Sequence, residues 1–323
     1  MGEKTSYSKP VKDICIEANE GADSIVRQMF ESGGFVAKKM AVGVDILETM
    51  SREEGCVKFF SSPSSPVSTG CRGIYKVLVK NKFIDVFITT SGMVDHDYAR
   101  VWRDYYHGDF EMDDAKLYKE GINREGNVLI PNECYGEILE DRIQPLLEKL
   151  YKEKKEYSTK ELCWALGESL KDEENKESSI LYWAWKNKIP IYIPGPTDGA
   201  FGSQLWLFSQ QKKDFKIDLF KDEQELNSIV MNAKSTGAFM IGGGISKHHT
   251  IWWNQFRGGL DYAVYITTAP EWDGSLSGAR VKEAISWGKV KEKAQHVDIE
   301  GDATTMLPLM ISSLMERLRS IQK

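Results

Sequence analysis

The sequence lacks the features that mark several common classes of protein. Its five cysteines never form a CxxC pair, which excludes a zinc ribbon and suits a reducing cytosol. No apolar run is long enough to cross a membrane, and the polar first residues lack the apolar core of a signal peptide. Basic residues are not in excess, and the net charge of −6 argues against a general nucleic-acid binder. We therefore expect a cytoplasmic protein with neither a membrane nor a nucleic-acid partner.

The common nucleotide-binding motifs are also absent. The sequence has no Walker motif, and its segment IGGGISK lacks the G-x-G-x-x-G spacing. Loops of small residues nevertheless follow a series of short apolar runs. The runs are CVKFF, IDVFITT, IPIYI, AFMI and DYAVYITT, and the loops are SSPSSPVSTG, SGM, PGPTDGAFG, GGG and APEWDGSLSG. Any one loop could be an ordinary tight turn, whereas a set of converging loops favours a ligand.

Apolar runs without strict alternation are typical of strands buried on both faces, and here helical segments separate them. We therefore predict an α/β fold, doubly wound around a mostly parallel sheet with flanking helices. Ligands of such sheets bind outside the carboxyl ends of the strands. Residues 21–50 have a helical pattern interrupted at Gly33-Gly34, which predicts two helices. We expect residues 1–55 to form a tail and helical extension packed on the core, and residues 56–323 to form one domain.

Two groups of polar side chains lie beside these loops. Asp95, His96 and Asp97 would occupy the first turn of one helix, and His248-His249 follow the glycines at the start of another. A metal site is conceivable, but acidic residues near a helix N-terminus are more often caps, and we expect no metal. One of the paired histidines could bond a ligand in the crevice, and the other is as readily a buried core residue.

Lys289 follows Trp-Gly in the segment EAISWGK. Glu283 and Trp287 would share one face of a helix, and Gly288 suits the end of that helix, so Lys289 would emerge beside the loops. By sequence alone a surface lysine at a helix C-terminus is the preferred interpretation. The competing interpretation is a desolvated amine that acts as a Schiff-base nucleophile.

Tryptophan is frequent in this part of the chain. We expect most of these side chains to be core residues, although an indole face can also bind an organic cation. They are Trp206, Trp252, Trp253, Trp272 and Trp287.

The segment from Asp261 to Asp302 resembles the deoxyhypusine synthases. The matching words are DYAVYITTA, DGSLSGAR, EAISWGK and GDA. Upstream, SSPVSTG, IDVFITTSG, GINREGNVLIPNE, TDGAFG and IGGGISKHH resemble the same family in the same order. DHDYAR and YYHGDFEMDD are most similar to its archaeal branch. The resemblance therefore runs from about Cys56 to the C-terminus.

The resemblance implies a homotetramer with a Rossmann-like core that binds NAD near its subunit interfaces. It also implies transfer of the aminobutyl group of spermidine to one lysine of the precursor of translation initiation factor 5A. Lys289 matches the lysine that carries the group as an imine, and His248 would move protons. The residues implied near the amine donor are Asp95, His96, Gly274, Glu283 and Trp287. Those implied to contact NAD are Ser64, Ser65, Ser68, Thr90, Ser91, Gly92, Asp198, Gly243, Thr268, Asp273, Asp302 and Ala303.

The sequence departs from this pattern at several acidic positions. Eukaryotic members carry two glutamates where this chain has Asp95-His96, and aspartates where it has Ser203 and Leu276. Spermidine remains the expected donor, and agmatine or another amine is the second candidate. A homospermidine synthase, which would use putrescine as acceptor, is a competing hypothesis for the activity. A non-catalytic homologue that binds NAD or polyamine is another, whereas the missing cysteine pairs disfavour a zinc-dependent NAD deacylase.

Overall fold

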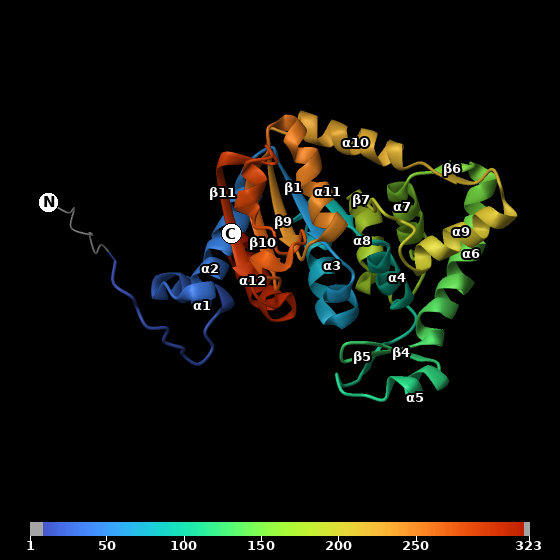
Figure 1. The fold of residues 1–323 in the computed structure, drawn as a ribbon, viewed down its shortest axis with the longest axis horizontal. Helices are drawn as coiled ribbons and strands as arrows, with labels where there is room; N and C mark the ends of the chain where they lie inside the picture. Colours follow the sequence, from blue (N-terminus) through green and yellow to red (C-terminus); the bar gives the residue numbers. More distant parts are fainter. Residues whose placement is uncertain (1–8, 320–323) are drawn as a thin grey trace.

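A computed structural model describes residues 9–319 of the chain. Its centre is a six-stranded sheet in the order β11-β10-β9-β1-β2-β7, and every pair of neighbours is parallel (Figure 1). The predicted runs all form strands of this sheet, which confirms the α/β prediction. The strands are β1 (Cys56–Ser62), β2 (Val86–Thr89), β7 (Ile191–Tyr192), β9 (Ser235–Ile241), β10 (Leu260–Thr267) and β11 (Val290–Glu300).

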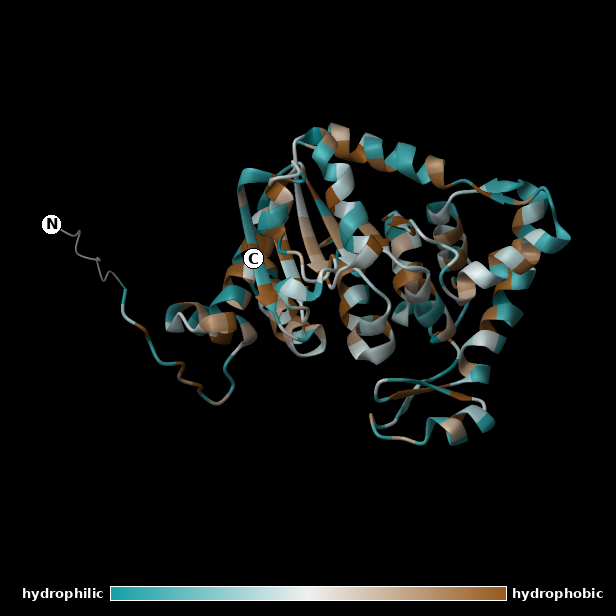
Figure 2. Cartoon of the chain, viewed as in Figure 1, coloured by the Kyte–Doolittle hydropathy of each residue, from teal (hydrophilic) through white to brown (hydrophobic). Residues whose placement is uncertain are grey.

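Burial on both faces explains why the strands other than the edge strand β11 are continuous apolar runs. Adjacent residues Phe59 and Phe60 of β1 are both fully buried, and they belong to different core clusters because successive side chains point to opposite faces. Figure 2 shows hydrophobic colours on the central strands and alternating hydrophobic and hydrophilic bands along the surrounding helices. The cluster around Phe60 includes α2 (Phe35–Arg52), α3 (Arg72–Lys80), α8 (Ile180–Asn187) and α12 (Ala303–Arg319), whereas that around Phe59 includes α10 (Leu219–Asn232) and α11 (Gly244–Asn254).

The direction of strand addition reverses between β1 and β9. From β1 the sheet grows through β2 to β7, and from β9 it grows through β10 to β11. Such a switch point leaves a crevice at the carboxyl ends of the two central strands, where doubly wound folds bind ligands. The loops after β1 and β9 meet there, since a Cβ built on Gly242 would lie 3.4 Å from Pro63.

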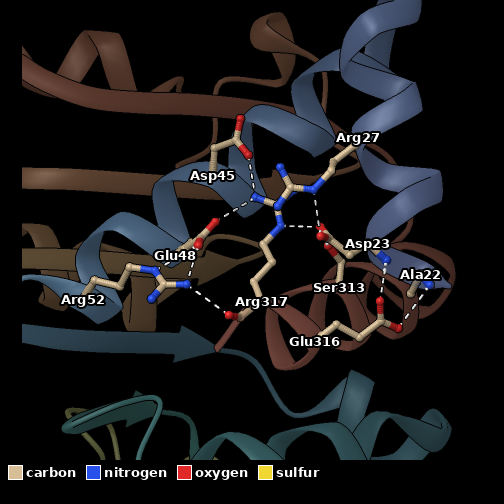
Figure 3. A network of polar contacts seen from close by, with 9 residues as sticks. All are labelled: Ala22, Asp23, Arg27, Asp45, Glu48, Arg52, Ser313, Glu316 and Arg317. Atoms are coloured by element: carbon tan, nitrogen blue, oxygen red, sulfur yellow. Dashed lines mark hydrogen bonds and ion pairs between the residues drawn. The ribbon is translucent and has the colours of Figure 1, made fainter. Parts of the chain in front are cut away.

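The N-terminal helices pack on one edge of this core. The predicted pair is α1 (Ala22–Ser32) and α2, joined at Gly33 and Gly34, where Gly33 adopts a φ of +68°. Arg317 of α12 donates hydrogen bonds to Asp23 of α1 and to Asp45 and Glu48 of α2 (Figure 3). This buried guanidinium therefore ties both ends of the described chain together. The expected division at residue 55 stays a prediction.

The chain between β2 and β9 adds, around β7, structure that the sequence did not predict. A small antiparallel sheet has the order β3-β5-β4, and a parallel pair joins β6 to β8. These strands are β3 (Tyr106–His107), β4 (Ile122–Glu125), β5 (Val128–Pro131), β6 (Glu156–Tyr157) and β8 (Lys216–Ile217). The remaining helices are α4 (Ser91–Ala99), α5 (Asp114–Lys119), α6 (Gly136–Glu153), α7 (Thr159–Ser169) and α9 (Ala200–Gln211).

Within residues 9–319, no helix is long and apolar enough to span a membrane. No group of three or more His, Cys, Asp or Glu side chains in that range could hold a metal ion.

Candidate active site

A cavity of about 380 Å³ lies between α11 and the chain that joins β10 to β11. Its lining extends from Met240, near the carboxyl end of β9, to Lys289, whose carbonyl accepts the N–H of Leu260 at the start of β10. The predicted residues His248, Glu283, Trp287 and Lys289 all line it. The other lining residues are Met240, Lys247, Ile251, Trp252, Leu276, Ala279, Arg280, Val281, Ala284 and Val290. The structure thus brings together residues from β9, α11, the loop after β10 and the start of β11.

Backbone geometry directs Lys289 into this cavity. Residues Val281–Ile285 form a short 3-10 helix, and Gly288 then adopts a φ of +67°, a conformation that favours glycine. The N–H of Lys289 donates to the carbonyl of Ala284 at 3.0 Å, which closes the turn. The Lys289 side chain is only 7% exposed, so the surface-lysine interpretation is wrong.

The helix prediction for this segment needs a correction. The 3-10 helix ends at Ile285, so Trp287 lies in the turn beyond it rather than on a helical face with Glu283. Both side chains line the cavity even so. Among the described residues, Glu283 is the one carboxylate that lines it, and Lys247, Arg280 and Lys289 contribute cationic side chains to the same lining.

His248 is the nearest polar partner of Lys289. Its Nε2 lies 3.3 Å from Lys289 Nζ. Burial, and then the charges of Lys289 and His249, hold the pKa of His248 below its usual 6.5. The imidazole is therefore neutral near pH 7, with a lone pair that can accept a proton. Its neighbour His249 turns to Glu223 of α10 at 3.1 Å, so only one of the paired histidines enters the cavity, as predicted.

Lys247 was not identified from the sequence, although it precedes His248 in the same motif. The side chain is buried, and its Nζ donates to the carbonyls of Leu276 at 2.8 Å and Ala279 at 2.6 Å. Burial lowers the pKa of Lys247 to about 8. Its two carbonyl bonds fix the loop after β10, which forms one wall of the cavity.

The expectation that most of the tryptophans are core residues is wrong. Exposed fractions are 60% for Trp206, 41% for Trp252, 86% for Trp272 and 66% for Trp287. Two of these exposed rings, Trp252 and Trp287, line the cavity around Lys289. The sequence could not separate them from core residues because helical spacing of aromatics is common to both situations.

The residues expected to contact NAD lie on the loops that follow the parallel strands. Several of these loops lie in contact with one another. A Cβ built on Gly92 would lie 2.9 Å from Ser64, which joins the loops after β1 and β2. A Cβ on Gly243 would lie 2.3 Å from Ser277 Oγ, which joins the loops after β9 and β10.

The remaining expected NAD contacts occupy the same end of the sheet. Asp198 and Thr268 are exposed on the loops after β7 and β10, and Ser65 is exposed on the loop after β1, where Ser68 is buried. Asp273 accepts hydrogen bonds from the N–H and hydroxyl of Ser275. Asp302 precedes Ala303 at the start of α12, where it accepts a bond from the N–H of Thr304 at 3.1 Å.

One buried side-chain oxygen at this end of the sheet, Ser91 Oγ, lacks a hydrogen-bond partner among the described residues. Ser91 itself is fully buried. A buried hydroxyl without a partner is unfavourable by about 1–3 kcal/mol, so a ligand that bonds it would be favoured here. Thr90 caps the same helix with extended backbone. The hydroxyls, glycines and acids present are the groups that hold the phosphates and ribose of a dinucleotide.

Asp95, His96 and Gly274 do not line the cavity around Lys289. Asp95 lies in the middle of α4 rather than in its first turn, and it caps a different helix by accepting the N–H groups of Ala200 and Phe201 of α9 at 2.9 and 2.7 Å. It also accepts the hydroxyl of Tyr135 at 2.8 Å. The carboxylate is fully buried, and burial raises its pKa to about 6.

His96 and Asp97 share this structural character. His96 stacks on Tyr135, and burial lowers its pKa to about 4. Asp97 pairs with Arg72 at 2.7 Å and accepts the N–H groups of Ile180 and Leu181 at the start of α8. The acids are caps, as expected, but of neighbouring helices. The roles of Asp95, His96 and Gly274 in binding the donor stay predictions.

Comparison with known proteins gives one consistent family. Residues 24–314 match the family model described as deoxyhypusine synthase. A Picrophilus torridus protein named "Probable deoxyhypusine synthase" is 54% identical, over 98% of this chain and 100% of the relative. Proteins of the same name from Thermoplasma acidophilum and Sulfurisphaera tokodaii are 51% and 44% identical, over 98% and 94% of this chain and 100% and 96% of the relatives.

Solved structures share the fold. An Entamoeba histolytica structure assigned to the deoxyhypusine synthases superposes with a TM-score of 0.66 at 19% identity, covering 92% of this chain and 94% of that one. AgrE, crystallised as a ternary complex with ornithine and NAD⁺, superposes with a TM-score of 0.54 at 13% identity. The superposition covers 89% of this chain and 34% of that one.

Proposed function

Because this chain belongs to the deoxyhypusine synthase family, whose members are transferases, we propose its full reaction from the residues around Lys289. The enzyme transfers the aminobutyl group of spermidine to one lysine of the precursor of translation initiation factor 5A. It uses NAD, works in the cytoplasm and assembles as a homotetramer. The single observation that carries the proposal is the buried Lys289 amine, 3.3 Å from the neutral imidazole of His248 inside the cavity.

Bound NAD would supply hydride exchange, first at the carbon beside the donor's amine and finally at the product imine. The residues proposed to hold it are the hydroxyls, glycines and acids of the strand-end loops. Ser91 carries most weight among them, because its buried hydroxyl lacks a partner in the described part of the chain.

Lys289 performs the transfer chemistry. Its amine attacks the carbon of the donor's imine, a bond from Nζ to that carbon forms, and the bond to the departing polyamine amine breaks. Lys289 then holds the butyl group as an imine. The amine of the target lysine attacks the same carbon and displaces Lys289. His248 accepts the proton that Lys289 loses on attack and returns one when Lys289 leaves.

The cavity walls orient and protect the donor. Glu283, the lining carboxylate, binds the donor's distal ammonium group, since opposite charges attract. Trp287 covers the imine and excludes water that would hydrolyse it. Leu276 lines the cavity where eukaryotic members carry an aspartate, so the donor meets fewer carboxylates here. This observation favours agmatine or another amine as the second candidate donor.

The test is direct incubation of the enzyme with NAD, labelled spermidine or agmatine, and the purified factor precursor. We expect label on a single lysine of the precursor, located by mass mapping. Parallel reactions with putrescine as acceptor test for a homospermidine synthase. Label in the putrescine product alone would show that the enzyme is a homospermidine synthase. No label in either acceptor would show that the protein is a non-catalytic homologue.

A further inference from the structure

Lys289 Nζ lies over two indole rings from different parts of the chain. The ring centroid of Trp252 on α11 is 5.2 Å from Nζ, and that of Trp287, in the turn before β11, is 5.1 Å away. Both distances are within the range of about 6 Å in which an aromatic face attracts a cation. Lys289 forms no ion pair within residues 9–319. The two rings and His248 are therefore the groups that surround its amine.

Neighbouring rings hold Trp252 in this position. His248 lies one turn earlier on the same face of α11, and its ring is tilted against Trp252 at a centroid distance of 5.5 Å. Phe256 contacts the indole edge-on at 6.4 Å from the other side. Trp252 is 41% exposed, so its indole forms part of the cavity wall rather than of the core. One helix face thus supplies both the proton acceptor and an aromatic wall.

We propose that Trp252 is the second wall of an indole cage, formed with Trp287, that holds the cationic imine of Lys289. This inference rests on the proposed function, because it requires Lys289 to carry an imine. A protonated imine is a cation, and two indole faces stabilise it without a carboxylate in contact with Nζ. The apolar rings also keep water from the imine carbon. Trp252 therefore determines how long the carbon fragment stays on Lys289 before water removes it.

The identity of the ring separates this role from simple packing. Phenylalanine keeps an aromatic face with weaker attraction for cations, and leucine keeps apolar bulk without one. A cage therefore predicts that the lifetime of the imine falls in the order Trp, Phe, Leu at position 252. A packing role predicts instead that a variant changes the thermal unfolding temperature while the lifetime of the imine is unchanged.

n-Butyraldehyde probes the cage without NAD or donor. The Lys289 amine adds to the carbonyl carbon, water leaves, and a protonated butylimine forms. The loaded enzyme is diluted into an aldehyde scavenger and quenched at intervals with borohydride, which delivers hydride to the imine carbon and leaves a stable butylamine. Mass spectrometry of the Lys289 peptide then gives the lifetime of the imine. Variants are Trp252→Phe and Trp252→Leu, with Trp206→Leu as an exposed control outside the cavity.

We expect the imine to be lost about tenfold faster in Trp252→Leu and about threefold faster in Trp252→Phe, with no change in Trp206→Leu. A lifetime in Trp252→Leu equal to that of the wild type would overturn the cage and leave the proposed function standing. Absence of butylated Lys289 in the wild-type enzyme would overturn the proposed function, and the cage with it. If Trp252→Leu does not fold, an unchanged lifetime in Trp252→Phe overturns the cage by itself.

Discussion

Replacing Gly243 with alanine should separate two loops that must touch to form the site. The Cβ of alanine would lie 2.3 Å from Ser277 Oγ, 2.4 Å from Ser277 Cα and 2.5 Å from Ser277 N. Two of these atoms are backbone, so no rotamer change can relieve the clash. Carbon atoms at rest are roughly 3.5–4.0 Å apart, so Ser277 must move by about 1 Å.

The expected loss of stability can be worked out from the hydrogen bonds at Ser277 and its neighbour Leu276. Its carbonyl accepts the hydroxyls of Tyr265 at 2.7 Å and Thr267 at 2.9 Å, and Lys247 binds the adjoining carbonyl of Leu276. Loss of two neutral hydrogen bonds and weakening of a charged one costs about 3 kcal/mol in the free energy of unfolding. The same movement displaces Leu276 from the cavity wall, so we also expect weaker binding of both donor and NAD.

Thermal unfolding and calorimetry with NAD measure the two effects. Gly73→Ala is the matched control, because a Cβ at that position in α3 meets nothing within 4 Å. This control should keep its NAD affinity and be equally or slightly more stable, since alanine favours helix. Wild-type stability and wild-type NAD affinity in Gly243→Ala would refute the claim that these loops must touch.

Three further predictions concern donor, cofactor and pH. The double variant Ser203→Asp, Leu276→Asp should shift relative kcat/KM towards spermidine over less charged amines, and no shift would show that these positions do not read donor charge. Asp302→Ala should weaken NAD binding about tenfold, because a carboxylate at the end of β11 can accept ribose hydroxyls; unchanged affinity by calorimetry would remove Asp302 from the site. Because burial lowers the pKa of His248, its neutral, proton-accepting form persists as pH falls past 6.5. The acid limb of kcat/KM should therefore lie below pH 6.5 and vanish in His248→Gln, whereas a limb above that pH would exclude His248 as the base.

Five strands of the main sheet were predictable as apolar runs because both of their faces are buried, whereas the edge strand β11 is mostly polar and was not among those runs. Runs such as IDVFITT have no polar face, and only a doubly covered sheet accommodates them. The small strands β3, β4 and β5 were missed because they are two to four residues long and mostly not fully buried, so no period is visible in them. Length and burial together decide which strands a sequence reveals.

The part of the site that was predictable from the sequence is the turn whose backbone conformation favours glycine. Gly288 ends the turn before Lys289 with a positive φ, as the sequence indicated. The caps made by Asp95 and Asp97 were not assigned to α9 and α8, because those helices begin far along the chain. The sequence analysis named Trp252, but it could not place that residue in one cavity with Trp287 and Lys289, which are distant in sequence.

Trapping the enzyme during turnover tests the central claim most directly. With NAD and the amine donor present, borohydride should leave a butylamine adduct on the wild-type peptide that contains Lys289. Lys289→Arg keeps positive charge, but guanidinium stays protonated and cannot form the imine. This variant should therefore keep its fold, give no adduct and transfer nothing to the factor precursor. Normal transfer by Lys289→Arg, or an adduct mapped to another lysine such as the neighbouring Lys247, would contradict the account.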